Sequence, residues 1–546
     1  MLQVLVRKGK VLFMGRGKHA QAISAKPRLG NPCYLGQALT NVPRCYILLP
    51  DAMHLKNRSG IEDNMPIGGA FRRAAEAAPV LAQGTLKDRA TLLEHIASSL
   101  AADGKAIVEC CQKETSYPAE RVQGEFRRML ALWTTFAEVV RNGGWLEARI
   151  DAAQPDRQPM PKPDIRRMNV PVGPVVIFGS SNFPLALGVA GSDPVSALAA
   201  GCPVLVKGHP SHAGTSELLR RAIVRVIQES GFPTGVYQQL EGESYELGQA
   251  LVRHPETRAV GFTGSLRGGR ALYDIAAARP DPIPVYAEMG SVNPQFVFPD
   301  ILAESPEAFA ERLFGSVTLG NGQFCTCPGL VFVPKRAGLD VLIKRYVSLA
   351  KSAKALPMLN GGMATTFADG VTAWKRLGGV TLHVDRPCTN DFAVSPVIAQ
   401  TDFDSFMTHR DGLLEEVFGP ATLLVVCEEL AQFNTAAAVM GGQLGASIHS
   451  ESGDTQLLML ALQRFAGRIV VNGFPTGIET THAMHHGGPY PATTHSQFTS
   501  LGQSAIRRWL RPVCFQDTPN SWLPEALQDD NPLGIPRMMD GVNAAH

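Results

Sequence analysis

The sequence predicts an α/β protein, and three features of the 546-residue chain support this class. Short apolar runs alternate with helical segments from residue 172 onward, which is typical of parallel sheets with right-handed crossovers. Apolar residues make up 45% of the chain, enough for large cores, while 53 Gly and 39 Pro indicate many turns but no low complexity. At about 150 residues per domain, the length suggests three or four folding units, or two large ones.

The segment before residue 145 is predicted to be helical. Apolar residues recur there at three-to-four spacing with few Gly or Pro between them. The expected helices cover residues 70–83, 88–103, 106–115 and 120–142. A charged stretch with four prolines follows at 151–167 and indicates an exposed arm or linker.

Two alternating regions follow. The expected strands of the first lie at 172–178, 204–206, 235–240 and 259–263, with helices at 194–200, 216–230 and 270–278. The expected strands of the second lie at 295–298, 330–333, 380–384, 422–426 and 468–471, with a last apolar run at 509–515. Ligands of such sheets bind at the carboxyl ends of the strands.

Charge and cysteine usage narrow the class further. The 51 basic and 49 acidic residues nearly cancel, so charge favours neither nucleic acid nor a membrane as partner. Residues 169–192 carry no charge, but Pro171, Pro174, Asn182 and Pro184 interrupt them, which favours a buried strand and turn over a membrane span. The ten cysteines are thinly spread and form no C-x-x-C pair. We therefore expect a reducing, cytoplasmic location and no metal site.

Residues 1–62 form an atypical basic extension. The first fifty residues contain no Asp or Glu, a composition shared by transit peptides and by chains with a mis-assigned start, here with Met53 or Met65 as the true start. We favour an unstructured or artefactual extension over a targeting signal.

Two residues are candidates for catalysis. Cys325 lies between glycines on a short polar loop, where backbone N–H groups could favour a thiolate; the alternative is an inert, buried thiol. Glu288 ends an apolar run just before Gly290, and burial there would raise its pKa and suit it as a general base. The alternative is a surface acid at the end of a strand.

A glycine-rich turn at 262–269 follows an expected strand and precedes an expected helix. A helix N-terminus after such a turn can bind a pyrophosphate. By itself this turn is a weak signal, because many glycine turns serve only the backbone.

Six motifs occur in an order that resembles the NAD(P)-dependent aldehyde dehydrogenase superfamily over about residues 69–517. They are Asn182-Phe183-Pro184, Lys207, the Phe-Thr-Gly-Ser of 262–265, the Glu-Met-Gly of 288–290, the Gly-Gln-Phe-Cys of 322–325 and the Glu-Glu-Val-Phe-Gly-Pro of 415–420. The segments 180–186, 207–210, 471–477, 486–493 and 510–513 resemble most the branch that oxidises α-ketoglutaric semialdehyde (2,5-dioxopentanoate) to 2-oxoglutarate. A neighbouring branch contains NADP-linked fatty aldehyde dehydrogenases.

The resemblance implies a catalytic role for each of four residues. Cys325 would attack the aldehyde carbon and become acylated, and the Asn182 amide would hold the oxyanion with the Cys325 backbone N–H. Glu288 would activate the water that hydrolyses the thioester, and His486 could assist proton transfer.

The resemblance also implies a cofactor site. Lys207 would bind the adenosine ribose, the turn with Gly264, Ser265 and Gly269 would meet the pyrophosphate, and Glu416 would anchor the nicotinamide ribose. Phe418 belongs to the same motif as Glu416.

Pro210 stands where NAD-preferring members usually carry Glu, and His209 and Lys207 could attract a 2′-phosphate. We therefore expect NADP to be preferred over NAD.

A substrate with a carboxylate needs a cation in its pocket. Arg127 and Arg128 on the helix 120–142 are the candidates, because this helix borders the substrate tunnel in the family; the alternative is that both are solvated. Phe183 and His486 would also line the pocket. Cys327 is unusual for the family and could either form a disulfide with Cys325 or simply pack.

The resemblance divides the chain into a Rossmann-type cofactor domain, an α/β catalytic domain and a small β oligomerisation arm. Their expected ranges are 63–145 with 170–290 for the cofactor domain, 291–484 for the catalytic domain, 146–169 with 485–517 for the arm, and 518–546 for a C-terminal extension. Because the arm pairs subunits in the family, it implies a homodimer or homotetramer. The resemblance also implies a small-molecule aldehyde as the substrate. The alternatives are a fatty or aliphatic aldehyde dehydrogenase and a non-catalytic structural relative.

Overall fold

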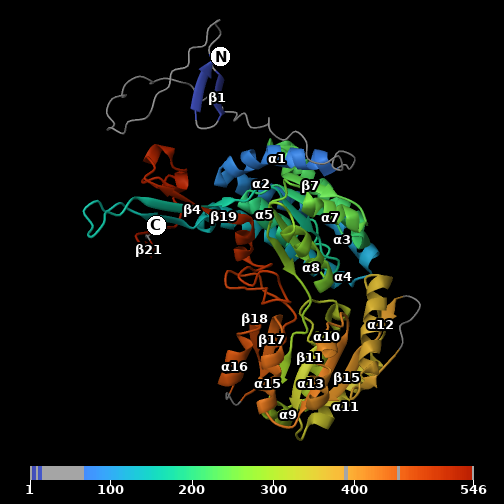
Figure 1. The fold of residues 1–546 in the computed structure, drawn as a ribbon. Helices are drawn as coiled ribbons and strands as arrows, with labels where there is room; N and C mark the ends of the chain where they lie inside the picture. Colours follow the sequence, from blue (N-terminus) through green and yellow to red (C-terminus); the bar gives the residue numbers. More distant parts are fainter. Residues whose placement is uncertain (1–2, 8–9, 15–66, 387–391, 452–454, 544–546) are drawn as a thin grey trace. The chain divides into compact units, whose positions relative to one another are not determined.

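The computed structural model describes residues 3–7, 10–14, 67–386, 392–451 and 455–543. The chain divides into two units, 1–61 and 62–546. In the first, β1 (Gln3–Arg7) and β2 (Lys10–Met14) pair as an antiparallel hairpin. The remainder of the predicted basic extension lies outside the described residues. All other described helices and strands belong to the second unit (Figure 1).

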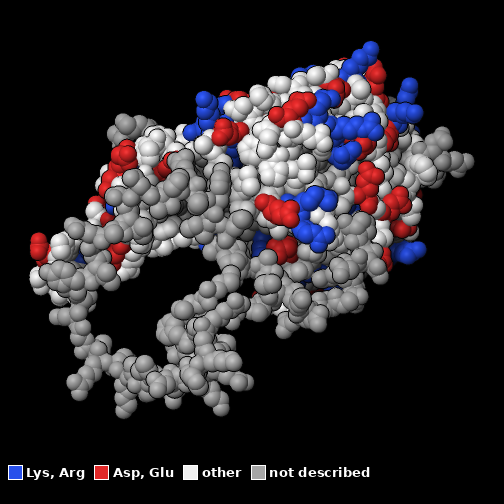
Figure 2. Space-filling view, turned by 90° about the horizontal axis from the view of Figure 1, so that it is seen from above, with Lys and Arg blue, Asp and Glu red and all other residues white. Residues whose placement is uncertain are grey.

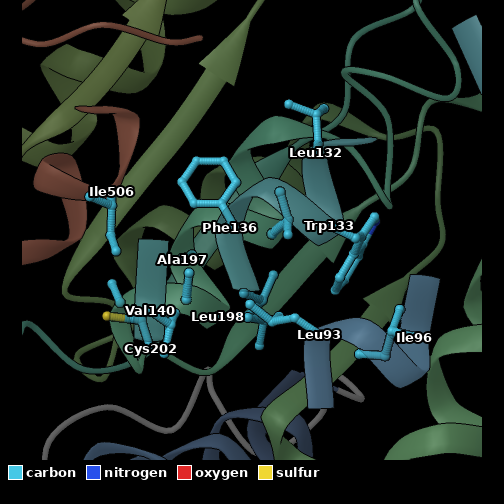
Figure 3. Close-up of a cluster of buried hydrophobic side chains, with 14 of the residues drawn as sticks. Leu93, Ile96, Leu132, Trp133, Phe136, Val140, Ala197, Leu198, Cys202 and Ile506 are labelled. Carbon is cyan, nitrogen blue, oxygen red and sulfur yellow. The ribbon is translucent and has the colours of Figure 1, made fainter. Parts of the chain in front are cut away.

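The four predicted N-terminal helices are confirmed, with small shifts at their ends. They are α1 (Ile67–Gln83), α2 (Leu86–Ala102), α3 (Gly104–Thr115) and α4 (Ala119–Asn142). The apolar face of α4 is buried against α2 and α5 (Ser192–Ala200), as Figure 3 shows for Trp133, Phe136 and Leu93. This packing matters for the site, because another face of α4 carries Arg121, Glu125 and Arg128.

A five-stranded, wholly parallel sheet follows, in the order β7-β6-β5-β8-β9. Its strands are β5 (Val175–Phe178), β6 (Val204–Lys207), β7 (Tyr237–Leu240), β8 (Ala259–Thr263) and β9 (Val285–Glu288). The helices of this region are α6 (Ala213–Ser230), α7 (Tyr245–Arg253) and α8 (Leu266–Ala277). Parallel pairing brings the carboxyl ends of β6, β8 and β9 to one edge of the sheet. The sequence prediction missed α7, although Ser244 caps it by accepting a bond from the Leu247 N–H.

The second sheet has seven strands in the order β13-β15-β16-β11-β10-β17-β18, parallel except for β13. They are β10 (Gln295–Val297), β11 (Leu330–Pro334), β13 (Thr381–Val384), β15 (Val397–Asp402), β16 (Ala421–Cys427), β17 (Gln443–His449) and β18 (Ala466–Val471). The sequence prediction missed β15 and β17. Strand β17 is buried along its whole length, yet Gln443, Ser447 and His449 interrupt any apolar run.

The remaining elements of this region are short strands and helices. Strands β12 (Leu356–Pro357) and β14 (Ala393–Val394) pair with each other. The helices are α9 (Pro299–Glu304), α10 (Pro306–Thr318), α11 (Leu339–Ser352), α12 (Gly361–Arg376), α13 (Phe403–Thr408), α14 (Arg410–Leu413), α15 (Ala431–Val439) and α16 (Gln456–Leu462). The predicted α/β class is thereby confirmed.

A third sheet contains the predicted arm, in the order β19-β4-β3-β20-β21. Strand β19 (Leu510–Gln516) pairs antiparallel with β4 (Ile165–Pro171), and the two run side by side in Figure 1. The last residues, set apart in the prediction as an extension, add β20 (Arg537–Met539) and β21 (Val542–Asn543) beside β3 (Ala148–Asp151). Between β3 and β4, residues 152–161 are exposed, as expected for an arm.

The surface carries charges of both signs. On the face drawn in Figure 2, Lys and Arg lie interspersed with Asp and Glu. Among the described helices, none combines the length and the apolar character that crossing a bilayer requires.

Candidate active site

Three distant segments of the chain meet at Cys325. The thiol follows the short 3-10 turn Leu319–Gly322, Glu288 ends β9, and His486 lies in the loop after β18. His486 Nε2 lies 3.0 Å from Glu288 Oε1 and 3.5 Å from Cys325 Sγ. His486 and Glu288 are 1% and 3% exposed, so their pairing is shielded from water. Cys325, Glu288 and His486, which were predicted as site residues from the sequence, therefore lie together in the structure.

Ser500 completes this cluster, and the sequence analysis did not find it. Its hydroxyl donates to Glu288 Oε2 and also lies 3.1 Å from the His486 carbonyl oxygen. The loop that carries it folds over β9, where Thr493 forms a bridge with Glu288. A lone serine in a Thr- and Ser-rich tail carries no local signal of this contact.

The pKa of Glu288 is lowered, and the predicted increase is wrong. Burial, the largest influence, raises this pKa, as the sequence argument assumed. The charge and hydrogen bond of His486, together with bonds from Ser500 and Cys325, outweigh it. Glu288 is therefore an ionised carboxylate surrounded by donors.

The Cys325 thiol has its pKa raised well above the ordinary value, which contradicts the expectation of a stabilised thiolate. Burial is the main cause, and the neighbouring Glu288 and Glu416 add to it. The Cys325 backbone N–H acts in the opposite direction but is outweighed. The thiol is therefore protonated at rest and needs a base.

Asn182 lies against the loop that carries Cys325. Its side-chain Nδ2 donates to the Gln323 carbonyl oxygen at 3.1 Å, and Asn182 is buried. Its own carbonyl oxygen accepts from Arg121 Nη2 at 2.9 Å. Asn182 Nδ2 is thus held against the backbone of Gln323, which precedes Cys325 by two positions in the sequence.

Asn293 fixes the other side of the same loop, and the sequence analysis did not identify it. Its Nδ2 lies 2.9 Å from the Cys325 carbonyl oxygen and 3.0 Å from that of Cys327. The Cys327 thiol points to the carbonyls of Val317 and Gly419, 3.7 and 3.8 Å away. Both cysteines are free in the structure, and Cys327 packs within the protein.

Beside Cys325 lies a mainly apolar pocket. Its lining residues are Arg128, Leu132, Phe183, Ala186, Leu187, Phe324, Cys325, Thr326, Gly477, Ile478, Thr480, His486 and Leu501. The rings of Phe183 and Phe324 meet edge to face at 5.0 Å. Arg127 and Arg128 are both exposed residues, but only Arg128 is among those that line the pocket.

The predicted cofactor residues lie mostly at the carboxyl edge of the five-stranded sheet. Lys207 ends β6, half-buried. Gly264 and Ser265 are exposed at the start of α8, where the Ser265 hydroxyl caps the helix by accepting from the Gly268 N–H at 3.2 Å. Gly269 is buried instead, and a Cβ there would lie 2.7 Å from Met289 Sδ. Its role is the close packing of α8 on β9.

His209 is a neutral group, which corrects its predicted role as a cation. Burial, together with the neighbouring His212 and Lys207, lowers its pKa to about 4. Its Nδ1 accepts from the Ser211 N–H at 3.2 Å, which leaves Nε2 as the donor. His209 can hydrogen-bond a phosphate but cannot attract it by charge at neutral pH.

Glu416 lies over Gly290, where a Cβ would come within 2.6 Å of its Oε2. Burial raises the pKa of Glu416 to about 8, opposed by the Ser291 backbone N–H and reinforced by Glu288. Phe418 and Glu416 line a second pocket together with Cys327 and Trp374. Glu416 and the loop that carries Cys325 and Cys327 therefore line the same pocket.

Residues 62–490 match the profile of the aldehyde dehydrogenase family. This chain is an aldehyde dehydrogenase. It is 44% identical to alpha-ketoglutaric semialdehyde dehydrogenase 2 of Azospirillum brasilense, over 88% of this chain and 92% of the relative. It is 39% identical to the alpha-ketoglutaric semialdehyde dehydrogenase of Acinetobacter baylyi, over 88% and 94%.

Solved structures show the same fold. The 1-pyrroline-5-carboxylate dehydrogenase from Thermus with bound NAD has a TM-score of 0.69 at 19% identity, covering 82% of this aldehyde dehydrogenase and 85% of that chain. A 3,6-anhydro-L-galactose dehydrogenase has the same TM-score at 22% identity, covering 82% and 90%. The predicted family membership and oxidoreductase class are confirmed, and the family uses NAD(P).

Proposed function

We propose that this aldehyde dehydrogenase oxidises 2,5-dioxopentanoate to 2-oxoglutarate through a thioester on Cys325. The observation that carries the proposal is the buried cluster of Cys325, Glu288 and His486 beside a pocket lined by Arg128. The two relatives named for the same semialdehyde, at 44% and 39% identity, support the choice of substrate.

Glu288 is the base that takes the thiol proton. Its lowered pKa makes it an acceptor, so His486 Nε2 carries a hydrogen that it donates to Oε1. Once the thiol has lost its proton, the same N–H faces Sγ across 3.5 Å. His486 thus stabilises whichever of the two groups is negative.

The thiolate sulfur then forms a bond to the aldehyde carbon. The carbonyl oxygen becomes negative, and Asn182 Nδ2 and the Cys325 backbone N–H hold it. NAD(P)⁺, when bound, supplies the acceptor for the hydride that leaves this carbon. The product on the enzyme is a thioester. Once Glu288 has released the thiol proton to solvent, it takes a proton from the water that attacks the thioester, and the acid leaves as the Cys325 sulfur is released.

The described residues fit a dinucleotide. Lys207 would hold the adenosine ribose, the exposed turn of Gly264 and Ser265 at the N-terminus of α8 would meet the pyrophosphate, and Glu416 would hold the second ribose. Pro210 contributes no carboxylate to repel a 2′-phosphate. NADP is therefore the preferred cofactor, with Lys207 as the attracting charge.

Arg128 is the partner for the substrate carboxylate, because it is the guanidinium among the lining residues of the pocket. The rest of that lining is mainly apolar, with Leu132, Phe183 and Ile478 among its members. This apolar character favours a second candidate, a dehydrogenase of aliphatic aldehydes.

Steady-state kinetics decides between the two substrates. The reduction of NADP and NAD is followed with 2,5-dioxopentanoate and with hexanal, which has no carboxylate. We expect at least a tenfold higher kcat/KM for 2,5-dioxopentanoate, and a higher kcat/KM for NADP than for NAD. A preference for hexanal would establish the aliphatic alternative, and a tenfold preference for NAD would refute the assignment of NADP.

The sheet of β3, β4 and β19 presents exposed side chains along β19, which supports its role as an arm between subunits. We assign the enzyme to the cytoplasm as a homodimer or homotetramer, and light scattering of the purified protein measures which one.

A further inference from the structure

Arg121, on the first turn of α4, lies between the two loops that carry the proposed catalytic groups. Its Nη2 donates to the Asn182 carbonyl oxygen at 2.9 Å, and its Nη1 donates to the Gly320 carbonyl oxygen at 3.1 Å. One planar guanidinium therefore joins the loop of the oxyanion amide to the loop of the nucleophile.

An aromatic cage fixes the orientation of this guanidinium. Its central carbon lies 3.6 Å from the centre of the Tyr117 ring, 5.2 Å from that of Phe324 and 5.5 Å from that of Phe183. Phe183 and Phe324 are the neighbours in sequence of Asn182 and Cys325. Two of the three rings thus belong to the same two loops as the carbonyl oxygens that accept from Arg121.

The loop that carries Cys325 has left-handed backbone where Arg121 binds it. Gly320 and Asn321 both have a φ of +58°, and a Cβ on Gly320 would lie 2.4 Å from Arg121 Nη1. The side chain of Gln323 also donates to the Gly320 carbonyl, at 3.3 Å, while the Gln323 carbonyl accepts from Asn182 Nδ2. Arg121, Asn182 and Gln323 therefore close a ring of hydrogen bonds across the two loops.

We propose that Arg121 is a positioning residue that holds the Asn182 amide in register with Cys325. It does not touch the reacting atoms; it acts through Asn182. Its removal lets the two loops separate, which moves the oxyanion donor away from the carbon that Cys325 attacks. A lysine keeps the charge but presents a single nitrogen instead of the planar fork that reaches both carbonyls.

This inference rests on the proposed function, because it presupposes the roles of Asn182 and Cys325. The test compares R121M and R121K with R141M, a control on the same helix whose side chain is exposed and paired with Glu94. We expect kcat to fall roughly 10- to 100-fold in R121M and less in R121K, with both KM values within about threefold of wild type. R141M should keep the wild-type kcat.

A double-mutant cycle separates positioning from support of the fold. Because Arg121 acts through Asn182, R121M/N182A should be no slower than N182A alone. The alkylation rate of Cys325 by iodoacetamide in the free enzyme should stay within about twofold of wild type in R121M, because Asn293 still holds the Cys325 carbonyl and His486 still faces the thiol. Should R121M fail to fold, R121K and R121K/N182A provide the same cycle.

Two results would overturn the inference: a wild-type kcat in R121M, or losses that multiply in the double variant. A wild-type kcat in N182A would instead refute the proposed role of Asn182 itself. The failure of the inference and that of the proposed function are thus distinguishable.

Discussion

Two carboxyl groups near Cys325, the buried Glu288 and the half-buried Glu416, differ in their charge at neutral pH. Glu288 has donors from His486, Ser500 and Cys325, and its pKa is lowered despite burial. Glu416 has one donor that acts on it, the Ser291 backbone N–H, and burial raises its pKa to about 8. The difference indicates that the charge of His486 and the bonded donors, rather than burial alone, decide whether a carboxylate in this site is ionised.

The two histidines of the site have different neighbours. His486 faces the carboxylate of Glu288, while His209 faces Lys207 and His212 and has its pKa lowered to about 4. The region around Glu288 is thus a set of groups that already bond one another. In the cofactor region, Lys207 lies beside the neutral His209.

The largest effect should follow from C325S, because an alcohol is a far weaker nucleophile than a thiolate. We expect kcat for 2,5-dioxopentanoate to fall by roughly 10⁴-fold or more. NADPH absorbance measures the rate, and fluorescence titration measures cofactor binding, which should be retained. A rate near wild type would disprove the thioester route.

E288Q tests the region around Glu288 directly. Glutamine keeps the shape but cannot accept a proton, so steady-state turnover should fall by roughly 10²- to 10⁴-fold. Because Glu288 serves as base for both the thiol and the water, the first-turnover burst of NADPH should slow as well. Stopped-flow absorbance measures it, and raising the pH should restore the burst by ionising the thiol directly. A burst of wild-type rate at neutral pH would show that another group deprotonates Cys325.

H486N removes the charge and the bond that lower the pKa of Glu288. Burial then dominates, so this pKa rises and the acidic limb of the kcat profile moves to higher pH. The sign follows because Glu288 works only when ionised, and a raised pKa leaves it protonated over a wider range. We expect roughly a 10-fold loss at pH 6 and a smaller loss at pH 9. An unchanged acidic limb would contradict the pairing.

R128M removes the proposed partner of the substrate carboxylate. KM for 2,5-dioxopentanoate should rise about tenfold while KM for hexanal stays unchanged. R127M, at the exposed neighbour that does not line the pocket, is the matched comparison and should change neither value. If R127M and R128M raised KM equally, the cause would be the loss of one positive charge near the site and not the loss of a contact between Arg128 and the substrate carboxylate.

The smallest effect concerns Glu416 on the cofactor side. With a pKa of about 8, it is protonated at pH 7 and becomes the stronger acceptor for hydroxyl groups as the pH rises. The kcat/KM for NADP should therefore rise about twofold to fivefold through pH 8, and E416Q should lack this rise. The same profile should show no step near the ordinary pKa of histidine, because His209 stays neutral there.

Much of the fold was predictable, and the errors have physical causes. The helices α1 to α4 bury one face each, so their apolar spacing is visible in the sequence. Strand β17 is buried along its length, and its Gln443 and His449 bond the distant Ser291 and Gln295, which no local pattern predicts. The order of the motifs identified Cys325, Glu288 and Asn182, but nothing local indicated Ser500 or Arg121. Helical spacing could have indicated Arg121 in part, because Glu125, Arg128 and Leu132 follow it at intervals of three or four residues and so lie on one face of α4.

The sequence by itself determined the α/β class and the family and predicted Cys325 as the nucleophile, because these depend on residue types at short spacing and on the order of motifs. Only the tertiary structure decided the charge of each catalytic group and which neighbours hold it in place. Protonation depends on burial and on donors that arrive from segments hundreds of residues apart, such as His486 and Ser500 at Glu288. Those distances exist only after the chain has folded.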